Sequence, residues 1–346
     1  MGTRPEIIKL HPVIKELKSE FEVVTVFTGQ HKDLGTQMLK EFKIKPDYTL
    51  DVMSESNSLS MVAANLHEQL DTVLNKEKPD LVVVQGDTTT AFIGAIEAFY
   101  HKIPVSHVEA GLRSHDWYNP FPEEMHRKLI DQISTHNFAP TAQAADNLKR
   151  ENLESVVTGN TGIDTLLQTA RRIKPSKKWQ VLVTLHRRES FGAPLERMLY
   201  GIKEFLAENP KFEVVLPVHP NPNVEKTVRN ALGKHSRVKI VKPFGYKQMV
   251  KEMKDSYFIM TDSGGIQEEA PSLKRPVLVL RDTTERPEGV EVGVARVVGT
   301  GAEDITYEAS RIAQSPLEYS LMIGDNPYGD GTASKKITSY LKEALS

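Results

Sequence analysis

LVVVQGDTTTAFIGAIEAF, residues 81–99, contains two structural patterns joined at a single glycine. Residues 81–85 are rich in valine and do not alternate, which is typical of a β-strand buried on both faces. From residue 88 onward the apolar side chains recur at helical spacing, and Asp87 stands where an N-cap residue is expected. The segment therefore predicts a strand that leads directly into a helix, which is the βα unit of a parallel sheet.

The same alternation continues on both sides of this segment. Further strands are predicted at 22–28, 104–109, 180–185, 213–218, 238–241, 257–261 and 276–280. Helices are predicted at 6–17, 58–75, 88–101, 123–134, 192–208, 245–254 and 331–345. Strands that alternate with helices predict an α/β protein built from doubly wound parallel sheets.

Two domains are expected from 346 residues, at roughly 100–200 residues per domain. The polar and basic segment ARRIKPSKKWQ, residues 170–180, separates the two series of βα units. We expect a Rossmann-like domain over residues 1–170, a second one beginning at residue 171, and a cleft between them.

The composition argues against several classes of protein. The chain has 44 basic and 46 acidic residues, and this net charge of −2 argues against general nucleic-acid binding, which needs a basic face. It has no cysteine, which excludes disulfides, thiolate nucleophiles and cysteine metal sites. Since no signal-like segment or apolar run of membrane length is present, we expect a cytoplasmic protein with no nucleic-acid or membrane partner.

Acidic residues stand at the ends of the predicted strands in the first half. Ligands of doubly wound sheets bind beyond the carboxyl ends of the strands, where Asp87 and Glu109 lie, and Glu123 follows in NPFPEEMHR. Carboxylates gathered in a cleft can supply an acid and a base. The structural alternatives are an N-cap for Asp87 and dipole compensation for Glu123. Glu109 ends an apolar strand before a glycine turn and has no comparable structural role.

The second half carries groups suited to phosphate. In TDSGGIQEEAPSLKRP, residues 261–276, a strand leads through Ser-Gly-Gly into a helix, whose N–H groups and dipole favour an anion. Glu268 and Glu269 could accept hydrogen bonds from sugar hydroxyls. The alternative is a plain glycine turn capped by its serine. The stretch is neither a GxGxxG fingerprint nor a Walker A loop, so a dinucleotide is not indicated.

Cationic side chains support the same interpretation. His186 opens HRRES at a strand end, and Arg286 in RDTTERPEG lies on a predicted loop from which it could bind a phosphate in a bidentate manner. The alternatives are a structural histidine and a solvated arginine. From the first half, Arg4, Lys9 and Arg113 are expected to add cations to the cleft. Groups suited to phosphate in the second half and acids in the first half together predict a nucleotide-linked substrate. The second domain would hold this substrate, and acids of the first domain would transform it.

The motifs, in this order over nearly the whole chain, resemble those of the non-hydrolysing UDP-N-acetylglucosamine 2-epimerases. They are GTRPE, TGQH, QGDTTT, HVEAGLRS, PFPEEMHR, GNTGID, HRRES, PVHPNP, TDSGGIQEEAPSL, DTTERPEG and NPYGDGTAS. The resemblance implies interconversion of UDP-GlcNAc and UDP-ManNAc, no cofactor, and a homodimer. It also implies a glycosyltransferase-B fold, with Rossmann-like domains over 1–170 and 171–328 and a last helix, 329–346, that crosses back to the first domain.

The resemblance also implies roles for individual residues. The catalytic set is Asp87, Glu109, Glu123 and His186. The set that binds UDP and sugar is Arg4, Lys9, Arg113, Ser263, Gly264, Gly265, Glu269 and Arg286. A regulatory site would use Gln30, His31 and His219. No metal ligand is implied, and the chain has no HExxH motif.

The sequence departs from the family pattern in two places. Members usually carry an apolar strand before GTRPE, whereas only Met1 and Gly2 precede Thr3 here. We expect unpaired edges on the neighbouring strands, and an upstream start that would supply the missing one. Asn65 stands about where members with the regulatory site carry an arginine, which argues against activation by substrate.

Chemistry favours elimination as the route. The proton on C2 is not adjacent to a carbonyl, so direct deprotonation is very costly. Oxidation at C3 would need a nicotinamide, for which the sequence has no fingerprint. Loss of UDP to give 2-acetamidoglucal needs cations that stabilise the leaving group, at least one carboxylate base and a matching acid. The alternatives are a hydrolysing epimerase, a UDP-sugar glycosyltransferase and a binding protein without turnover, and the assignment of acid and base stays open.

Overall fold

The computed structural model describes residues 1–53, 58–174, 176, 179–187, 190–218 and 221–346. The chain forms two compact units. The first, which we call the N-terminal unit, comprises Met1–Thr165 and Gly329–Ser346, and the second, the C-terminal unit, comprises Leu166–Tyr328. The boundary between them falls inside helix α7 (Thr161–Ala170), a few residues before the expected one.

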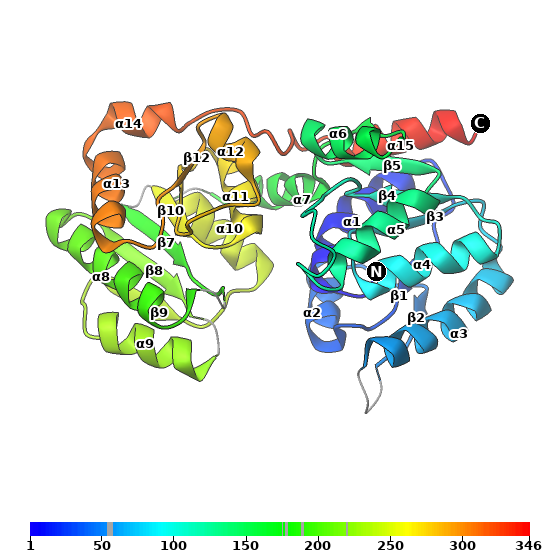
Figure 1. The fold of residues 1–346 in the computed structure, drawn as a ribbon, viewed down its shortest axis with the longest axis horizontal. Helices are drawn as coiled ribbons and strands as arrows, with labels where there is room; N and C mark the ends of the chain where they lie inside the picture. Colours follow the sequence, from blue (N-terminus) through cyan, green and yellow to red (C-terminus); the bar gives the residue numbers. More distant parts are fainter. Residues whose placement is uncertain (54–57, 175, 177–178, 188–189, 219–220) are drawn as a thin grey trace. The chain divides into compact units, whose positions relative to one another are not determined.

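The N-terminal unit contains a parallel four-stranded sheet (Figure 1). Its strands, in spatial order, are β3 (Val82–Gln85), β4 (Val105–Val108), β5 (His136–Ala139) and β6 (Val156–Val157). The helices of this unit are α1 (Arg4–Leu17), α2 (Lys32–Phe42), α3 (Leu59–Glu77), α4 (Thr89–Tyr100), α5 (Glu123–Ile133), α6 (Ala142–Arg150) and α15 (Ala333–Ala344).

A second, two-stranded sheet of this unit pairs β1 (Val26–Phe27) with β2 (Tyr48–Thr49). Only two residues of the strand predicted at 22–28 pair with another strand. Within the described residues, β1 pairs with β2 alone and β3 with β4 alone. The first residue contacts the free edge of β1, because the Met1 amino group donates to the Val26 carbonyl (3.1 Å).

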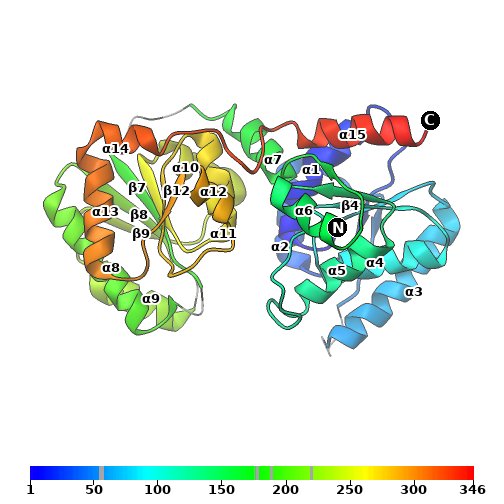
Figure 2. The same ribbon diagram turned by 45° about the horizontal axis from the view of Figure 1, so that its top comes forward.

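The last helix packs onto the first. Ile337 and Leu341 of α15 share a buried apolar cluster with Leu10 and Val13 of α1, and the two helices lie side by side (Figure 2). The buried Asp164 carboxylate accepts hydrogen bonds from the backbone N–H groups of Ala333 (3.2 Å) and Ser334 (2.9 Å), at the start of α15. Burial raises the pKa of Asp164, and these hydrogen bonds oppose that effect. The C-terminal segment is therefore an integral part of the N-terminal unit.

The C-terminal unit is built on one parallel six-stranded sheet. Its strands, in spatial order, are β12 (Ala295–Val297), β11 (Val277–Val279), β10 (Phe258–Thr261), β7 (Gln180–Thr184), β8 (Glu213–Pro217) and β9 (Val238–Val241). The order runs outward in both directions from the central pair β7 and β10. This reversal point is where doubly wound sheets bind ligands, beyond the carboxyl ends of the strands.

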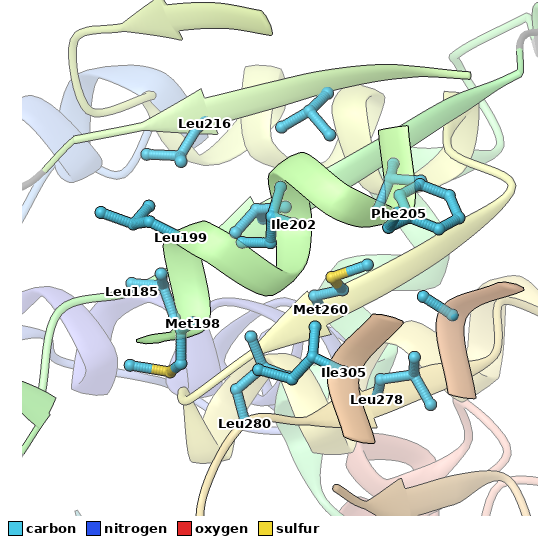
Figure 3. Close-up of a cluster of buried hydrophobic side chains, with 14 of the residues drawn as sticks. Leu185, Met198, Leu199, Ile202, Phe205, Leu216, Met260, Leu278, Leu280 and Ile305 are labelled. Atoms are coloured by element: carbon cyan, nitrogen blue, oxygen red, sulfur yellow. The ribbon is translucent and has the colours of Figure 1, made fainter. Parts of the chain in front are cut away.

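The core of this unit lies under helix α8 (Ala193–Glu208). Met198, Ile202 and Phe205 are fully buried against the sheet and against Ile305 of α13 (Ala302–Gln314) (Figure 3). Gly201 allows the close approach of the two helices, because a Cβ there would lie 2.6 Å from the Ala302 carbonyl oxygen. The remaining helices are α9 (Pro222–Leu232), α10 (Tyr246–Asp255), α11 (Gly264–Glu269), η2 (Ala270–Leu273), α12 (Pro287–Glu291) and α14 (Pro316–Leu321).

The predicted α/β class with parallel sheets is confirmed. The valine-rich strand predicted at 81–85 is present as β3, and the strand predicted at 213–218 as β8. The sequence reading missed β5, because His136-Asn137-Phe138-Ala139 lacks the β-branched residues of the other strands. Among the described helices, none is long and apolar enough to cross a membrane.

Candidate active site

A cavity of about 330 Å³, lined mostly by polar residues, lies in the N-terminal unit at the carboxyl ends of β3 and β4. Its walls come from the first turns of α1 and α5, from the end of β3 and from the turn that follows it. The lining residues are Thr3, Pro5, Glu6, Lys9, Gln30, His31, Leu59, Gln85, Gly86, Asp87, Thr88, Thr89, Glu109, Pro122, Glu123 and His126. Six residues predicted for the site are therefore brought together: Lys9, Gln30, His31, Asp87, Glu109 and Glu123.

Glu109 is held by both carboxylate oxygens. Lys9 of α1 forms an ion pair with Oε1, and the Gln85 side-chain amide donates to Oε2. The backbone of Glu109 has φ +71°, in the left-handed region that non-glycine residues rarely adopt. Such strain persists where the surrounding structure fixes it, commonly at functional sites. Charge and hydrogen bonding thus hold an anionic carboxylate at the wall of the cavity.

Asp87 is paired differently. Its Oδ2 accepts a hydrogen bond from Arg127 Nη2 at 2.6 Å, and the helix after β3 is capped by Thr88, whose hydroxyl accepts from Ala91 N–H (3.1 Å). Asp87 is therefore free of the N-cap role that was its structural alternative. Its carboxylate pairs with a guanidinium rather than an ammonium, so two acids of one cavity have distinct partners.

His126 is a site residue that the sequence reading missed. Its Nδ1 lies 2.9 Å from the Asp87 carbonyl oxygen, which can only accept, so Nδ1 carries the proton. Burial lowers the pKa of His126, although its contacts with Asp87 and Glu123 oppose this. The neutral ring then has a free lone pair on Nε2. The available signal was spacing, because His126 follows Glu123 by three residues and shares its face of α5.

The two adjacent glutamates of α5 differ in role. Glu123 lines the cavity, whereas Glu124 is fully buried beside it. Glu124 accepts hydrogen bonds from the backbone N–H groups of Ser114 (2.9 Å) and His115 (3.2 Å), and lies 3.4 Å from Arg127. Glu124 therefore fixes the loop that precedes α5, and Glu123 is available to a ligand.

Arg113, which the sequence predicts to bind substrate, is not among the residues that line this cavity. Its side chain is fully buried, donating to both oxygens of Glu151 (2.8 and 2.7 Å) and to Asp131 (2.7 Å). Burial acts to lower the pKa of Arg113, but the two carboxylates outweigh it and the pKa is raised. The hydrogen bond with Arg113 in turn lowers the pKa of Glu151. The guanidinium is already occupied by protein carboxylates, so its role here is structural.

Of the three residues predicted for a regulatory site, the structure describes two. Gln30 and His31 line the same cavity as the acids, and Gln30 Oε1 accepts from the Thr90 hydroxyl (2.8 Å). Asn65, where an arginine was expected, donates to the Val52 carbonyl (3.0 Å). His219 lies outside the described residues. Arg4 is the first residue of α1 and does not line the cavity.

In the C-terminal unit, arginines gather at the glycine turn after β10. A Cβ on Gly264 would lie 3.9 Å from the guanidinium groups of both Arg187 and Arg286. Arg286 pairs with Glu268, and Glu285 lies 3.7 Å from Arg187. Burial acts to raise the pKa of Glu285, but the surrounding arginines outweigh it and lower the pKa. This concentration of positive charge suits a polyanionic group such as a diphosphate.

The other predicted residues of this unit lie around the same turn. Ser263 is the N-cap residue of α11, and its side chain makes no capping hydrogen bond. Among the described residues, no atom outside the turn lies within 4 Å of a Cβ placed on Gly265. Glu269 ends α11 and is half-buried. His186 follows β7, and its Nδ1 lies 2.9 Å from the buried carboxylate of Asp262, which also accepts from the His186 backbone N–H (2.8 Å). Asp262 was not predicted.

Two residues of the NPYGDG motif support this turn. Asn326 donates to the Glu268 carbonyl (2.7 Å), and the Tyr328 hydroxyl donates to the Arg286 carbonyl (3.1 Å). Tyr328 is buried, and burial raises the pKa of its hydroxyl, so that the group is protonated and can donate. The motif therefore holds the segment that carries Arg286.

These features define a class: a protein of two Rossmann-like units, with acids gathered in one unit and arginines at a glycine turn in the other. The fold is of the glycosyltransferase-B type, and the glycotransferase of kitacinnamycin shares it at 11% identity and a TM-score of 0.67, covering 99% of this chain and 96% of that one. Residues 15–342 match the family model described as UDP-N-acetylglucosamine 2-epimerase.

Close relatives agree with this match. The UDP-N-acetylglucosamine 2-epimerase of Bacillus subtilis is 45% identical, covering 98% of this chain and 93% of its own. A crystal structure of UDP-GlcNAc 2-epimerase from Neisseria meningitidis, bound to UDP-GlcNAc, is 41% identical with a TM-score of 0.88, covering 99% of this chain and 98% of that one. The chain belongs to the UDP-N-acetylglucosamine 2-epimerase family, which confirms the resemblance seen in the sequence.

Replacing Arg113 tests its structural role. Arg113→Ala leaves the buried Asp131 carboxylate and the half-buried Glu151 carboxylate without their cation, so the free energy of unfolding should fall by about 3–5 kcal/mol. Because the folded pKa of Glu151 is lowered, its pairing stabilises the fold above the unfolded pKa and is lost as pH falls through the folded pKa. Urea unfolding across this acid range should show a weaker pH dependence in the variant. Arg4→Ala is the matched control for loss of an arginine. A free energy of unfolding that is unchanged in Arg113→Ala would contradict the structural role assigned to Arg113.

Proposed function

We propose that this protein catalyses the reversible, non-hydrolysing C2 epimerisation of UDP-N-acetylglucosamine to UDP-N-acetylmannosamine. Family membership supports the reaction, and the relative from Neisseria meningitidis is bound to UDP-GlcNAc. The observation that carries the proposal is the cavity in which Glu109, paired with Lys9, shares the walls with Asp87, Glu123 and His126. Such a set provides more than one proton donor and acceptor, which inversion at carbon requires.

The proposed route is elimination followed by re-addition. The C2–H and C1–O bonds break, a C1=C2 double bond forms, the proton passes to a basic side chain, and UDP leaves with the electron pair of the C1–O bond. Return of a proton to the other face of C2 and attack of UDP on C1 give the epimer. Each bond broken is remade, so the route is redox-neutral and needs no cofactor.

The two units contribute differently to this route. Arg286, Arg187 and His186, with the Ser263–Gly265 turn, would bind the diphosphate and stabilise its charge as it leaves. Glu269 would accept from the ribose. In the N-terminal unit, Glu109 is the proposed proton-transfer residue at C2, with Asp87, Glu123 and His126 as its partners.

We also propose a cytoplasmic homodimer. Support for a dimer comes from apolar side chains exposed on two helices that pack against each other, with Phe99 of α4 59% and Leu129 of α5 38% exposed. Burial of such residues against a second copy would remove apolar surface from water.

Incubation of the protein with UDP-GlcNAc, followed by NMR, tests the reaction. We expect a mixture of UDP-GlcNAc and UDP-ManNAc that reaches the same ratio from either side. Free ManNAc and UDP would indicate the hydrolysing reaction, and transfer of the sugar to an acceptor without C2 inversion would indicate a glycosyltransferase. Binding of UDP-GlcNAc without any product would show a binding protein and would refute the proposal.

Glu109→Gln separates chemistry from binding. The amide keeps the shape of the side chain but cannot take a proton, so kcat should fall by at least about 100-fold, the lower range for loss of a general acid or base. Affinity for UDP should stay close to that of the unmodified protein, because the proposed diphosphate groups lie in the C-terminal unit. Glu68→Gln, at an exposed carboxylate of α3, is the control for carboxylate loss. Turnover that is unaffected by Glu109→Gln would exclude Glu109 from the mechanism.

A further inference from the structure

A second cluster of titratable side chains lies at the far end of α4, away from the cavity. His67 and Asp71 lie four residues apart on α3, and Glu97 and His101 lie four residues apart at the end of α4. Residues at this spacing share one helix face, and α3 packs against α4 (Figure 1). Two helices therefore each present a histidine and a carboxylate to the same place.

The donor atoms of these side chains converge. Asp71 Oδ1 lies 2.8 Å from His101 Nε2, and Glu97 Oε1 lies 3.7 Å from the same nitrogen. One ligand atom from each of Asp71, Glu97 and His101 lies within 4.8 Å of the others. His67 Nδ1 is not part of this group of three atoms, but lies 2.5 Å from Oε2, the second oxygen of the Glu97 carboxylate. Donor atoms around a tetrahedral zinc ion lie about 3.3 Å apart, so small rotations of these side chains would complete a coordination sphere.

The burial of the Glu97 side chain favours a bound cation over hydrogen-bonded pairs alone. The Glu97 side chain is only 7% exposed. In the described part of the chain, it forms ion pairs with His67 and His101. A carboxylate removed from water needs compensating positive charge, and an imidazole provides it only when protonated. A divalent cation bound by all four groups would balance both carboxylates while each imidazole stays neutral.

Neighbouring residues orient the cluster. The Tyr100 ring stacks on His67, with centroids 6.1 Å apart and planes 19° from parallel. The Asn75 side-chain amide donates to Asp71 Oδ1 at 3.0 Å. Contacts of this kind hold the ligands of metal sites in position. The Asp71 side chain is 52% exposed, which leaves a path for an ion to enter.

We propose that His67, Asp71, Glu97 and His101 form a Zn²⁺ site that joins α3 to α4. Two imidazoles and two carboxylates suit zinc and related first-row ions better than Mg²⁺ or Ca²⁺, which prefer oxygen ligands alone. α4 has 12 residues and spans about 18 Å, so the site is remote from the cavity at its N-terminus. The bound ion would stabilise the N-terminal unit and take no part in epimerisation.

Calorimetric titration of the full-length, chelator-treated protein with Zn²⁺ tests the site. We expect one ion per chain, a rise in Tm that saturates at that ratio, and, with Co²⁺ in its place, the visible absorption bands of tetrahedral cobalt. His101→Ala and Glu97→Gln should each weaken Zn²⁺ binding by at least the roughly 10–100-fold that loss of an outer-shell partner costs. Epimerisation should be unchanged in these variants.

Matched controls make the test selective. Glu68→Gln changes an exposed carboxylate of α3, and His115→Ala removes an exposed histidine elsewhere in the unit, so both should bind Zn²⁺ normally. His67→Ala, at a partly exposed position, gives a second ligand variant in case Glu97→Gln disturbs packing, and circular dichroism verifies folding. The absence of stoichiometric Zn²⁺ binding, or binding that His101→Ala and His67→Ala leave intact, would overturn the proposal.

Discussion

The geometry of the candidate active site depends on one fully buried carboxylate, Asp131 of α5. It accepts hydrogen bonds from the Gly111 backbone N–H (3.2 Å) and from Arg113 (2.7 Å), and its other oxygen lies 2.6 Å from His107 Nδ1. The opposite nitrogen of His107 lies 2.8 Å from the Gly86 carbonyl oxygen. A buried charge is tolerated only with such partners. Through them, α5 fixes the turns at the ends of both β3 and β4, which carry the acids of the cavity.

On this frame, each acid meets a different environment. Glu109 is paired with an ammonium and an amide, Asp87 with the guanidinium of Arg127, and Glu123 faces the cavity at the start of α5. His126 adds a neutral imidazole, because burial lowers its pKa. A set of titratable groups with unequal surroundings can divide the tasks of acid and base, which is what removal and return of a proton at one carbon demand.

The sequence predicted most of the fold, because parallel strands buried on both faces, such as β3 at 82–85, stand out by composition. Within the site it predicted Glu109, which ends a strand without a structural role. It could not distinguish Arg113, whose guanidinium turns inward to Asp131 and Glu151, from an arginine that faces a ligand, since motifs do not specify side-chain direction. It missed His126 because the importance of that residue depends on burial.

The central claim is that the C2 proton is removed to a protein group that exchanges with solvent, while UDP departs and returns. Turnover of UDP-GlcNAc in D₂O, followed by NMR and mass spectrometry, tests this claim most directly. The account predicts one deuterium at C2 of the UDP-ManNAc formed, and of the UDP-GlcNAc regenerated at equilibrium. UDP-ManNAc that forms without deuterium at C2 would contradict it.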